Sequence, residues 1–334
     1  QTRPHPPEPI HQALPPEIPT PAQAQRTSIG LNLTLISVGS LLFAFIIFAL
    51  ISIRIGQGAL ITRLEENLRT DTLETNERIR NKLLEARTIA SGLATAVETG
   101  TYNVEELQKI IQNTVSRNER IYGATAGYEP YQFNTAFNYW SPYYNRTLDN
   151  TLQYTPLGDF DYFNQEWYFL PKRLLAPTLS PPYRNASRGN IWITTWSIPF
   201  YNNEGDFRGV AAADIDFSKI QETFVNIQVG KTGYAFLLDS SGTILGIGQK
   251  GKRYTPMVDS MFAVANNPTA TNWLTVITNM TDGQTGFMEA TDVDGNPMYI
   301  SYAPVGLDTG WSLALVYPLE EVIQQTRDLQ TALM

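Results

Sequence analysis

Residues 209–220, "GVAAADIDFSKI", place an acid near the end of a run of small apolar residues. In a β-strand, successive side chains point to opposite faces of the sheet. One face would carry Val210, Ala212, Asp214 and Asp216, and the other Ala211, Ala213 and Ile215. A strand that is apolar on both faces is buried, and a buried carboxylate is costly unless it is paired. Asp214 therefore needs a partner, either within this chain or in a bound molecule.

Both kinds of partner remain open from the residues alone. An internal role would pair Asp214 with a basic side chain or with backbone amides; the candidates are Arg184, Arg188 and Lys172. A ligand-binding role would have the carboxylate accept the ammonium group of a cationic molecule, because charge-assisted hydrogen bonds strengthen where water is excluded.

The segment around Asp214 predicts a hairpin followed by a helix. Two runs of β-forming residues in 190–215 flank the turn Asn203-Glu204-Gly205. Residues 216–224, "DFSKIQETF", are typical of a helix with Asp216 at its N-cap. Upstream, residues 122–130 and 137–144 predict strands, and residues 164–176 predict a short helix that Pro171 interrupts.

A second cycle of the same elements follows. It consists of a strand, turn and strand in 233–248, a hairpin through Asp294-Gly295-Asn296 in 285–305, a strand in 310–318 and an amphipathic helix in 319–334. We therefore expect two related α+β modules, with the boundary near residues 225–231.

Composition excludes several classes of site. The 334 residues include no cysteine, and the two histidines, His5 and His11, lie at the extreme N-terminus. Cysteine nucleophiles, disulfides, thiolate metal sites and histidine-based catalysis are therefore excluded from the rest of the chain. The net charge of −8, without a basic stripe, argues against nucleic-acid binding.

The N-terminal third predicts a tail and a membrane anchor. Residues 1–28 hold eight of the 21 prolines and are predicted to be a disordered tail. Residues 29–53 carry no charge, and a bilayer core needs about 20 apolar residues, so we expect a transmembrane helix over 29–54. A cleaved signal peptide is the alternative, but the apolar run is long for one. Arginines on the two flanks are nearly balanced, so charge does not fix the orientation.

Residues 55–99 predict a long stalk helix. Several aliphatic residues recur at helical spacing: Leu60, Leu64, Leu68, Leu83, Ile89 and Leu93. This face would pack on the following modules, or pair with the same face of a second copy, or do both. A homodimer is the expected assembly.

Five motifs in this order resemble the double Cache family, the extracytoplasmic sensor regions of bacterial transmembrane receptors. They are "EWYFLP" (166–171), "LSPPYRN" (179–185), "WSIPFYNNEGDFRGVAAADIDFSKI" (196–220), "KTGYAFLLDSSGTILG" (231–246) and "PMYISYAPVGLDTGWSLALVYP" (297–318). The proline-rich leader and the many tyrosines and tryptophans also resemble cyanobacterial members.

The resemblance implies an α+β fold with two tandem PAS-like Cache modules, each built on an antiparallel sheet. Residues 100–226 would form the membrane-distal, ligand-binding module, and residues 227–318 the membrane-proximal one. Residues 319–334 would form a closing helix that leads toward a second membrane span outside this chain.

The resemblance also implies a ligand site. In the amino-acid-binding subgroup, an aspartate at the position of Asp214 receives the ligand ammonium, and aromatic residues at Trp167, Tyr168 and Tyr183 line the pocket. That subgroup has an arginine where this chain has Gln165 and an aspartate where it has Asn185. The carboxylate-binding arginine is therefore missing, which puts an α-amino-acid ligand in doubt.

The expected function is extracytoplasmic sensing of a small molecule, an amine or an amino-acid derivative, by a receptor in the inner membrane. The signal would pass through helices to a cytoplasmic output of kinase, phosphatase, cyclase or chemotaxis type that this chain does not contain. We expect no enzymatic activity, catalytic residue, metal or cofactor. The alternative is a module that binds no ligand and serves dimerisation or binds a periplasmic partner protein.

Overall fold

The computed structural model describes residues 29–147, 149–157, 161–185, 191–251 and 253–332. The predicted tail over 1–28, the candidate partner Arg188 and the last two residues of the predicted closing helix lie outside the described residues. The chain divides into two compact units, residues 1–58 and residues 59–334.

Helix α1 (Ile29–Thr99) spans the predicted membrane and stalk segments without a break. Its N-terminal part is long and apolar enough to cross a membrane, a property that signal sequences share, and no other helix among the described residues has it. The predicted transmembrane segment, residues 29–54, and the predicted stalk helix, residues 55–99, both lie within this one helix.

The first module, predicted to be membrane-distal and called the distal module below, contains helix α2 (Val104–Arg117), which begins with a capping box between Asn103 and Glu106. Its other elements are β1 (Gly123–Tyr128), β2 (Pro142–Arg146), β3 (Leu152–Pro156), η1 (Tyr162–Asn164), α3 (Glu166–Leu174), β4 (Thr178–Leu179), β5 (Tyr183–Asn185), β6 (Ile191–Tyr201) and β7 (Phe207–Asp216). The strands form one antiparallel sheet in the order β3-β2-β1-β7-β6-β4, with β5 also paired to β6.

Helix α4 (Ser218–Val225) follows β7 and precedes the proximal module. That module contains β8 (Tyr234–Leu238), β9 (Ile244–Ile247), η2 (Gln249–Gly251), α5 (Met261–Ala265), α6 (Trp273–Thr281), β10 (Gly286–Thr291), β11 (Pro297–Pro304), β12 (Ser312–Pro318) and α7 (Leu319–Ala332). Its sheet order is β10-β11-β12-β8-β9. In both sheets the first strand lies between the second strand and the last one, so the predicted repeat is confirmed.

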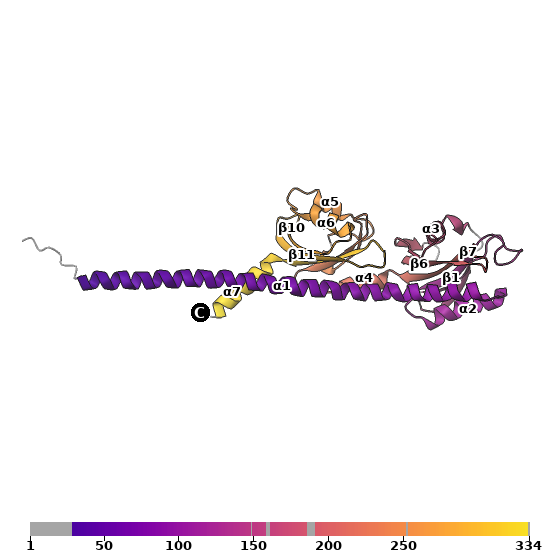
Figure 1. Ribbon diagram of the computed structural model, residues 1–334, viewed down its shortest axis with the longest axis horizontal. Coiled ribbons are helices and arrows are strands. Elements are labelled where there is room, and N and C mark those ends of the chain that lie inside the picture. The colour runs from indigo at the N-terminus through magenta and orange to yellow at the C-terminus, as the bar shows by residue number, and fades with distance from the viewer. Residues whose placement is uncertain (1–28, 148, 158–160, 186–190, 252, 333–334) are drawn as a thin grey trace, which may run out of the picture. The chain divides into compact units, whose positions relative to one another are not determined.

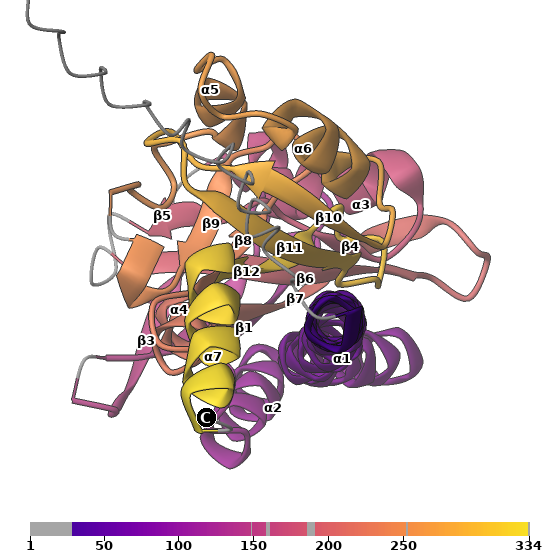
Figure 2. The same ribbon diagram turned by 90° about the vertical axis from the view of Figure 1, so that its left-hand side faces the viewer.

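Helix α1 covers the same face of both sheets (Figure 1), and the end-on view shows α5 and α6 on the side of the proximal sheet away from it (Figure 2). The predicted alternation along β7 matches this layering. Ala211, Ala213 and Ile215 belong to the core cluster that contains buried residues of α1 and α2, whereas Val210 and Ala212 belong to a separate aromatic cluster.

The leucine-rich face of α1 packs on the modules of its own chain. Leu68, Leu83 and Leu93 are at most 3% exposed. Two buried polar contacts attach the same helix to β11: the Thr72 hydroxyl bonds the Ser301 hydroxyl at 2.9 Å, and the Asn76 amide bonds the Ala303 carbonyl at 3.1 Å. This face is therefore occupied within the chain, and self-pairing requires another face of α1.

Two predictions of local structure are wrong. Pro171 does not interrupt α3, which continues through it to Leu174. Proline removes one hydrogen bond from a helix interior, but Pro171 is buried among the residues that α3 packs on the sheet. Tertiary packing therefore outweighs the local preference. The predicted N-cap of the next helix is wrong by one residue: Phe217 is the N-cap of α4 and its side chain makes no capping hydrogen bond, whereas Asp216 Oδ1 accepts hydrogen bonds from the Ser218 amide at 2.9 Å and the Ser218 hydroxyl at 2.7 Å.

Candidate functional site

Asp214 is buried in the centre of the distal sheet, with 6% of its surface exposed. Both of its carboxylate oxygens accept hydrogen bonds from hydroxyl groups of the chain. The Thr195 hydroxyl donates to Oδ1 at 2.7 Å, and the Tyr143 hydroxyl donates to Oδ2 at 2.7 Å. These bonds offset part of the cost of burying the acid.

The two donors reach Asp214 from different distances across the sheet. Thr195 is its direct cross-strand partner on β6. Tyr143 lies on β2, and β1 runs between that strand and β7. The residue of β1 that pairs with Asp214 is Gly123, where an added Cβ would lie 2.4 Å from the Tyr143 hydroxyl oxygen. A glycine at this position leaves room for the tyrosine side chain to cross β1.

A third hydroxyl extends the cluster toward the edge of the sheet. The hydroxyl groups of Tyr183 and Thr195 lie 2.9 Å apart, and Tyr183 is only partly buried on β5. The chain of groups Tyr183, Thr195, Asp214 and Tyr143 therefore runs from a partly exposed edge to a fully enclosed interior. We call these four residues the Asp214 cluster.

Burial raises the pKa of Tyr143 well above its ordinary value, and the adjacent Asp214 carboxylate raises it further. Both effects disfavour a second negative charge at this place. Tyr143 thus stays protonated at physiological pH and acts as a permanent hydrogen-bond donor. Each carboxylate oxygen carries two lone pairs, so each can accept more than one hydrogen bond.

Trp167 and Tyr168, predicted as pocket walls, lie on α3 in the aromatic cluster that faces β7. Trp167 is 7% exposed and Tyr168 is fully buried. Trp167 stacks on Tyr162 at a centroid distance of 5.8 Å, and Tyr143 belongs to the same cluster. These aromatic residues therefore lie on the sheet face that carries Val210 and Ala212.

The Tyr168 hydroxyl belongs to a second polar cluster, which lies just beyond the far end of β1. It donates to Glu129 at 2.7 Å, and the Lys172 ammonium bonds both oxygens of Glu129 at 2.8 Å. The internal partner Lys172 considered for Asp214 is therefore engaged with Glu129. Arg184, the other described candidate, is exposed on β5.

The remaining predicted site residues are Gln165 and Asn185. Gln165 is exposed at the start of α3, where its backbone N–H donates to the Tyr162 carbonyl at 3.0 Å. Asn185 is buried on β5 and pairs with Ile191. The structure thus brings Asp214 together with Tyr183, through Thr195, and places Trp167 and Tyr168 in the neighbouring cluster. Within the described residues, no group of three or more acidic or histidine side chains could hold a metal ion.

Sequence reasoning missed Tyr143 and Thr195, the two hydroxyl donors to Asp214. The motifs "SPYYN" and "WITTWS" each offer two adjacent candidates, and only one of each pair can face Asp214. The pairing register chooses Tyr143 over Tyr144 and Thr195 over Thr194. Gly123 at the start of β1 was the available signal, since a glycine within a strand often marks a close approach by another group.

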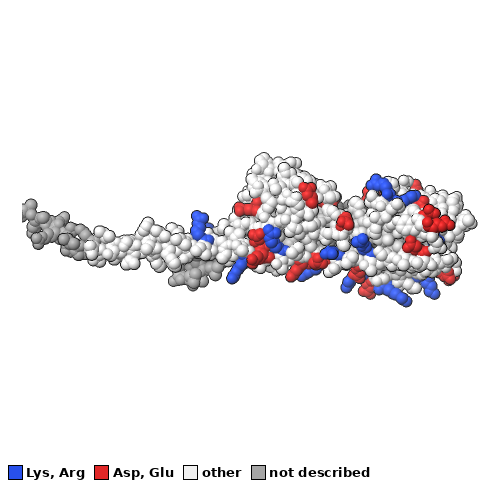
Figure 3. All heavy atoms as spheres, viewed as in Figure 1, with Lys and Arg blue, Asp and Glu red and all other residues white. Residues whose placement is uncertain are grey.

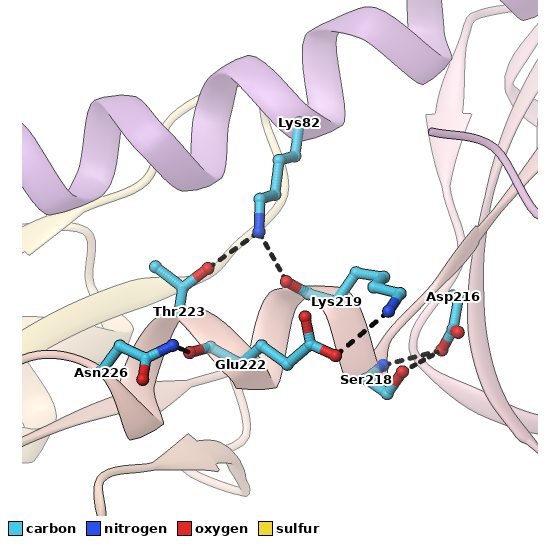
Figure 4. A network of polar contacts seen from close by, with 7 residues as sticks. All are labelled: Lys82, Asp216, Ser218, Lys219, Glu222, Thr223 and Asn226. Atoms are coloured by element: carbon cyan, nitrogen blue, oxygen red, sulfur yellow. Dashed lines mark hydrogen bonds and ion pairs between the residues drawn. The ribbon is translucent and has the colours of Figure 1, made fainter. Parts of the chain in front are cut away.

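A polar connection runs from the end of β7 to α1 (Figure 4). Asp216, two residues beyond Asp214, accepts a hydrogen bond from the backbone amide of Ser218, the first residue of α4. From α1, the Lys82 ammonium donates to the Lys219 carbonyl at 2.5 Å and to the Thr223 hydroxyl at 3.0 Å, both on α4. Burial lowers the pKa of Lys82. The strand that carries Asp214 is thus joined to α1 by consecutive short contacts.

Charged side chains follow a mixed pattern on the face that Figure 3 draws. Basic and acidic groups alternate along both modules and do not gather into a single patch. Neighbouring opposite charges form ion pairs such as Arg120–Glu85 at 2.7 Å and Lys219–Glu222 at 3.1 Å. On this face, the charged side chains are distributed as on an ordinary solvent-exposed surface.

Comparisons with known proteins support a sensor fold. Residues 107–222 match the family model described as the first PDC sensor domain of methyl-accepting chemotaxis protein-like proteins. A search of curated proteins finds no match.

Among solved structures, the extracellular domain of mmHK1S-Z3, described as a histidine kinase, is 21% identical, with a TM-score of 0.66 over 81% of this chain and 98% of that one. The periplasmic sensory domain of the chemoreceptor Tlp1 of Campylobacter jejuni is 15% identical, with a TM-score of 0.61 over 79% and 98%. The ligand-binding domain of the amino-acid chemoreceptor PctC of Pseudomonas aeruginosa, in complex with GABA, is 19% identical, with a TM-score of 0.53 over 76% and 99%.

The two sheets of like topology and these similarities confirm the resemblance predicted from the motifs: residues 107–222 match a chemoreceptor-type PDC sensor domain, and the chain shares the fold of solved extracellular sensor domains.

Proposed function

We propose that this chain senses a small cationic molecule outside the cytoplasm and that the distal module binds it at the Asp214 cluster. The observation that carries the proposal is a buried carboxylate within a cluster of hydroxyl groups that opens toward a partly exposed tyrosine. Such a carboxylate can accept an ammonium group through charge-assisted hydrogen bonds. The similarity to sensor domains solved with GABA and with asparagine supports a ligand that carries an amino group.

The proposed signal leaves the distal module through β7 and α4. A ligand that binds two closure states of the module with different affinity shifts their populations. Asp216, Ser218 and Lys82 provide the contacts through which a shift of β7 would reach α1. Interface helices move by about 1–2 Å in such transitions.

A calorimetric titration of the full chain in detergent with GABA, asparagine and simple alkylamines tests the ligand proposal. The change Asp214→Asn should weaken amine binding by about 30-fold to several thousand-fold, because removing one partner of a buried charge pair costs about 2–5 kcal/mol. Asp206→Asn is the matched control, since Asp206 is exposed in the β6–β7 turn. Gln165→Arg should extend binding to ligands that also carry a carboxylate. Equal amine binding by the parent and Asp214→Asn would reject Asp214 as the amine site.

We further propose that α1 anchors the chain in the inner membrane with residues 55–334 on the extracytoplasmic side. Protease added to intact cells should then cut within residues 100–334 and spare the N-terminal tail. Cleavage of the tail alone would reverse this topology.

A second candidate function is a module without a ligand that serves dimerisation or binds a partner protein. It is favoured by the hydrogen bonds of Asp214 itself, because Tyr143 and Thr195 already satisfy an acceptor site on each oxygen. Under this alternative, Asp214→Asn lowers stability and no amine binds the parent protein. The titration, with circular dichroism as the folding control, separates the two candidates.

A further inference from the structure

The proximal sheet repeats the backbone geometry around Asp214 with different side chains. In the distal sheet, the first residue of β1, Gly123, pairs with Asp214, two residues before the end of β7. In the proximal sheet, the first residue of β8, Tyr234, pairs with Val316, two residues before the end of β12. Val316 therefore occupies the position equivalent to Asp214.

The equivalent position also faces the same side. Val316 belongs to the core cluster that contains α6 residues, on the side of the proximal sheet away from α1. A cavity of about 470 Å³ opens there, and its lining includes Tyr234, Lys250, Arg253, Tyr254, Met298 and Val316. This volume lies within the usual range of small-molecule sites, about 300–1,000 Å³.

The charge character of this cavity differs from that of the Asp214 cluster. An apolar valine replaces the buried acid, and the lining carries two basic residues, Lys250 and Arg253, beside two acidic ones, Asp292 and Glu320. Two acids of the β10–β11 turn are engaged locally: Asp292, which lines the cavity, accepts the Asn296 backbone amide at 2.8 Å, and Asp294, outside the lining, pairs with Arg253 at 2.5 Å.

Two hydrogen-bond donors in the lining of the cavity are available to a bound molecule. Within the described residues, the Lys250 ammonium forms no ion pair and the Tyr234 hydroxyl forms no hydrogen bond. Burial raises the pKa of Tyr234 well above its ordinary value, so its hydroxyl stays protonated and can donate. Met298, Val316 and the Tyr254 ring offer apolar surface beside these donors.

We propose that this cavity is a second ligand site, independent of the Asp214 cluster, which takes a small organic carboxylate. The carboxylate bonds Lys250 and the Tyr234 hydroxyl, and the apolar part of the ligand packs on Met298 and Val316. Glu320 and Ile323 of α7 also line the cavity. An occupant therefore contacts the helix that follows the last strand of the proximal module.

The test is titration of the full chain in detergent with acetate, propionate and benzoate, each compared with its uncharged amide, by calorimetry and by saturation-transfer NMR. We expect saturable binding of at least one carboxylate and none of its amide. Lys250→Gln and Tyr234→Phe should each weaken this binding by about tenfold or more, the loss expected when a hydrogen bond to a charged group is removed. Lys231→Gln, an exposed lysine of the same module outside the lining, is the control.

Asp214→Asn should leave carboxylate binding unchanged, which distinguishes this site from the amine site. The proposal is overturned if none of the three carboxylates binds saturably, or if binding persists unchanged in both Lys250→Gln and Tyr234→Phe. Loss of binding in Asp214→Asn would move the carboxylate to the distal module. Loss of binding in Glu320→Gln would show that the ligand must also carry a cationic group, and would overturn a simple carboxylate as the ligand of this cavity.

Discussion

The Tyr143 hydroxyl bonds Asp214 Oδ2 at 2.7 Å although a third strand, β1, separates the two strands that carry these residues. Strands two places apart in a sheet lie about 10 Å from each other, so the contact needs a long side chain and an open path. Gly123 on β1 provides that path. The contact makes the stability of the distal sheet depend on a polar bond between non-adjacent strands.

Replacing Tyr143 with phenylalanine should lower the free energy of unfolding by about 1–3 kcal/mol. The change removes a hydroxyl donor from a buried carboxylate while keeping the aromatic ring. Chemical denaturation followed by circular dichroism measures the effect. Tyr144→Phe is the matched control, because Tyr144 is the next residue of β2 and its ring packs on Tyr154. Equal stability of the two variants would mean that the bond contributes nothing.

Replacing Gly123 with alanine should destabilise the protein, because the new Cβ would lie 2.4 Å from the Tyr143 hydroxyl oxygen and displace it from Asp214. We expect a loss of about 1–3 kcal/mol, typical of overpacking a well-packed core. The comparison is Gly92→Ala on the exposed side of α1, where an added Cβ meets no atom within 4 Å. There the change should raise stability by about 1 kcal/mol, because alanine favours a helix. Opposite signs in thermal unfolding are the expected result, and a stabilising Gly123→Ala would contradict the model of the crossing tyrosine.

Stability should fall at alkaline pH. Burial raises the pKa of Tyr128 to about 12, and also raises the pKa of Tyr162 and Tyr168. Such a tyrosine has a higher pKa in the folded chain than in the unfolded chain, so the unfolded chain loses this proton at lower pH. The contribution of the tyrosine to stability is therefore complete below about pH 10 and is lost as the pH rises from about 10 toward 12. Each such group adds up to about 1.4 kcal/mol per pH unit to the slope with which the free energy of unfolding falls.

Urea denaturation between pH 8 and pH 11.5 measures this slope. Tyr128→Phe should make it shallower, whereas Tyr131→Phe, which removes a tyrosine with 58% of its surface exposed, should not. A slope that Tyr128→Phe leaves unchanged would show that Tyr128 ionises normally in the folded chain.

Replacing Lys82 with methionine should loosen α4. The change keeps the aliphatic stem of the side chain and removes the hydrogen bonds to Lys219 and Thr223. Hydrogen exchange of the amides in 218–225 should accelerate by about fivefold, equivalent to about 1 kcal/mol for a partly exposed bond. Lys109→Met on the exposed side of α2 serves as the control. Unchanged exchange in α4 would argue against Lys82 as its connection to α1.

If two copies of the chain pair through α1, they should do so through its outward face. Leu73 and Leu84 are 54% and 39% exposed, whereas Leu83 and Leu93 are buried against the modules. Because the chain has no cysteine, single cysteines at Leu73 and Leu84 should crosslink in membranes and cysteines at Leu83 and Leu93 should not. Absence of crosslinks at both outward positions would favour a monomeric α1.

The sequence by itself determined the order of elements. Helical spacing, β-forming runs and turn residues act over a few positions, and they predicted the helical segments 29–54 and 55–99, the hairpin around Gly205 and the second cycle after residue 226. The alternation of Val210 and Ala212 with Ala211 and Ala213 likewise predicted the two faces of β7, because a strand has a fixed period of two.

Only the tertiary structure decided what surrounds Asp214. Sequence patterns do not specify strand register across a sheet, yet the register determines that Tyr143 and Thr195, and not their neighbours Tyr144 and Thr194, bond the acid. It also decided that the leucines of α1 cover their own modules, and that Val316 occupies in the proximal sheet the place of Asp214. These relationships join residues far apart in the chain, and local preferences carry no information about such distances.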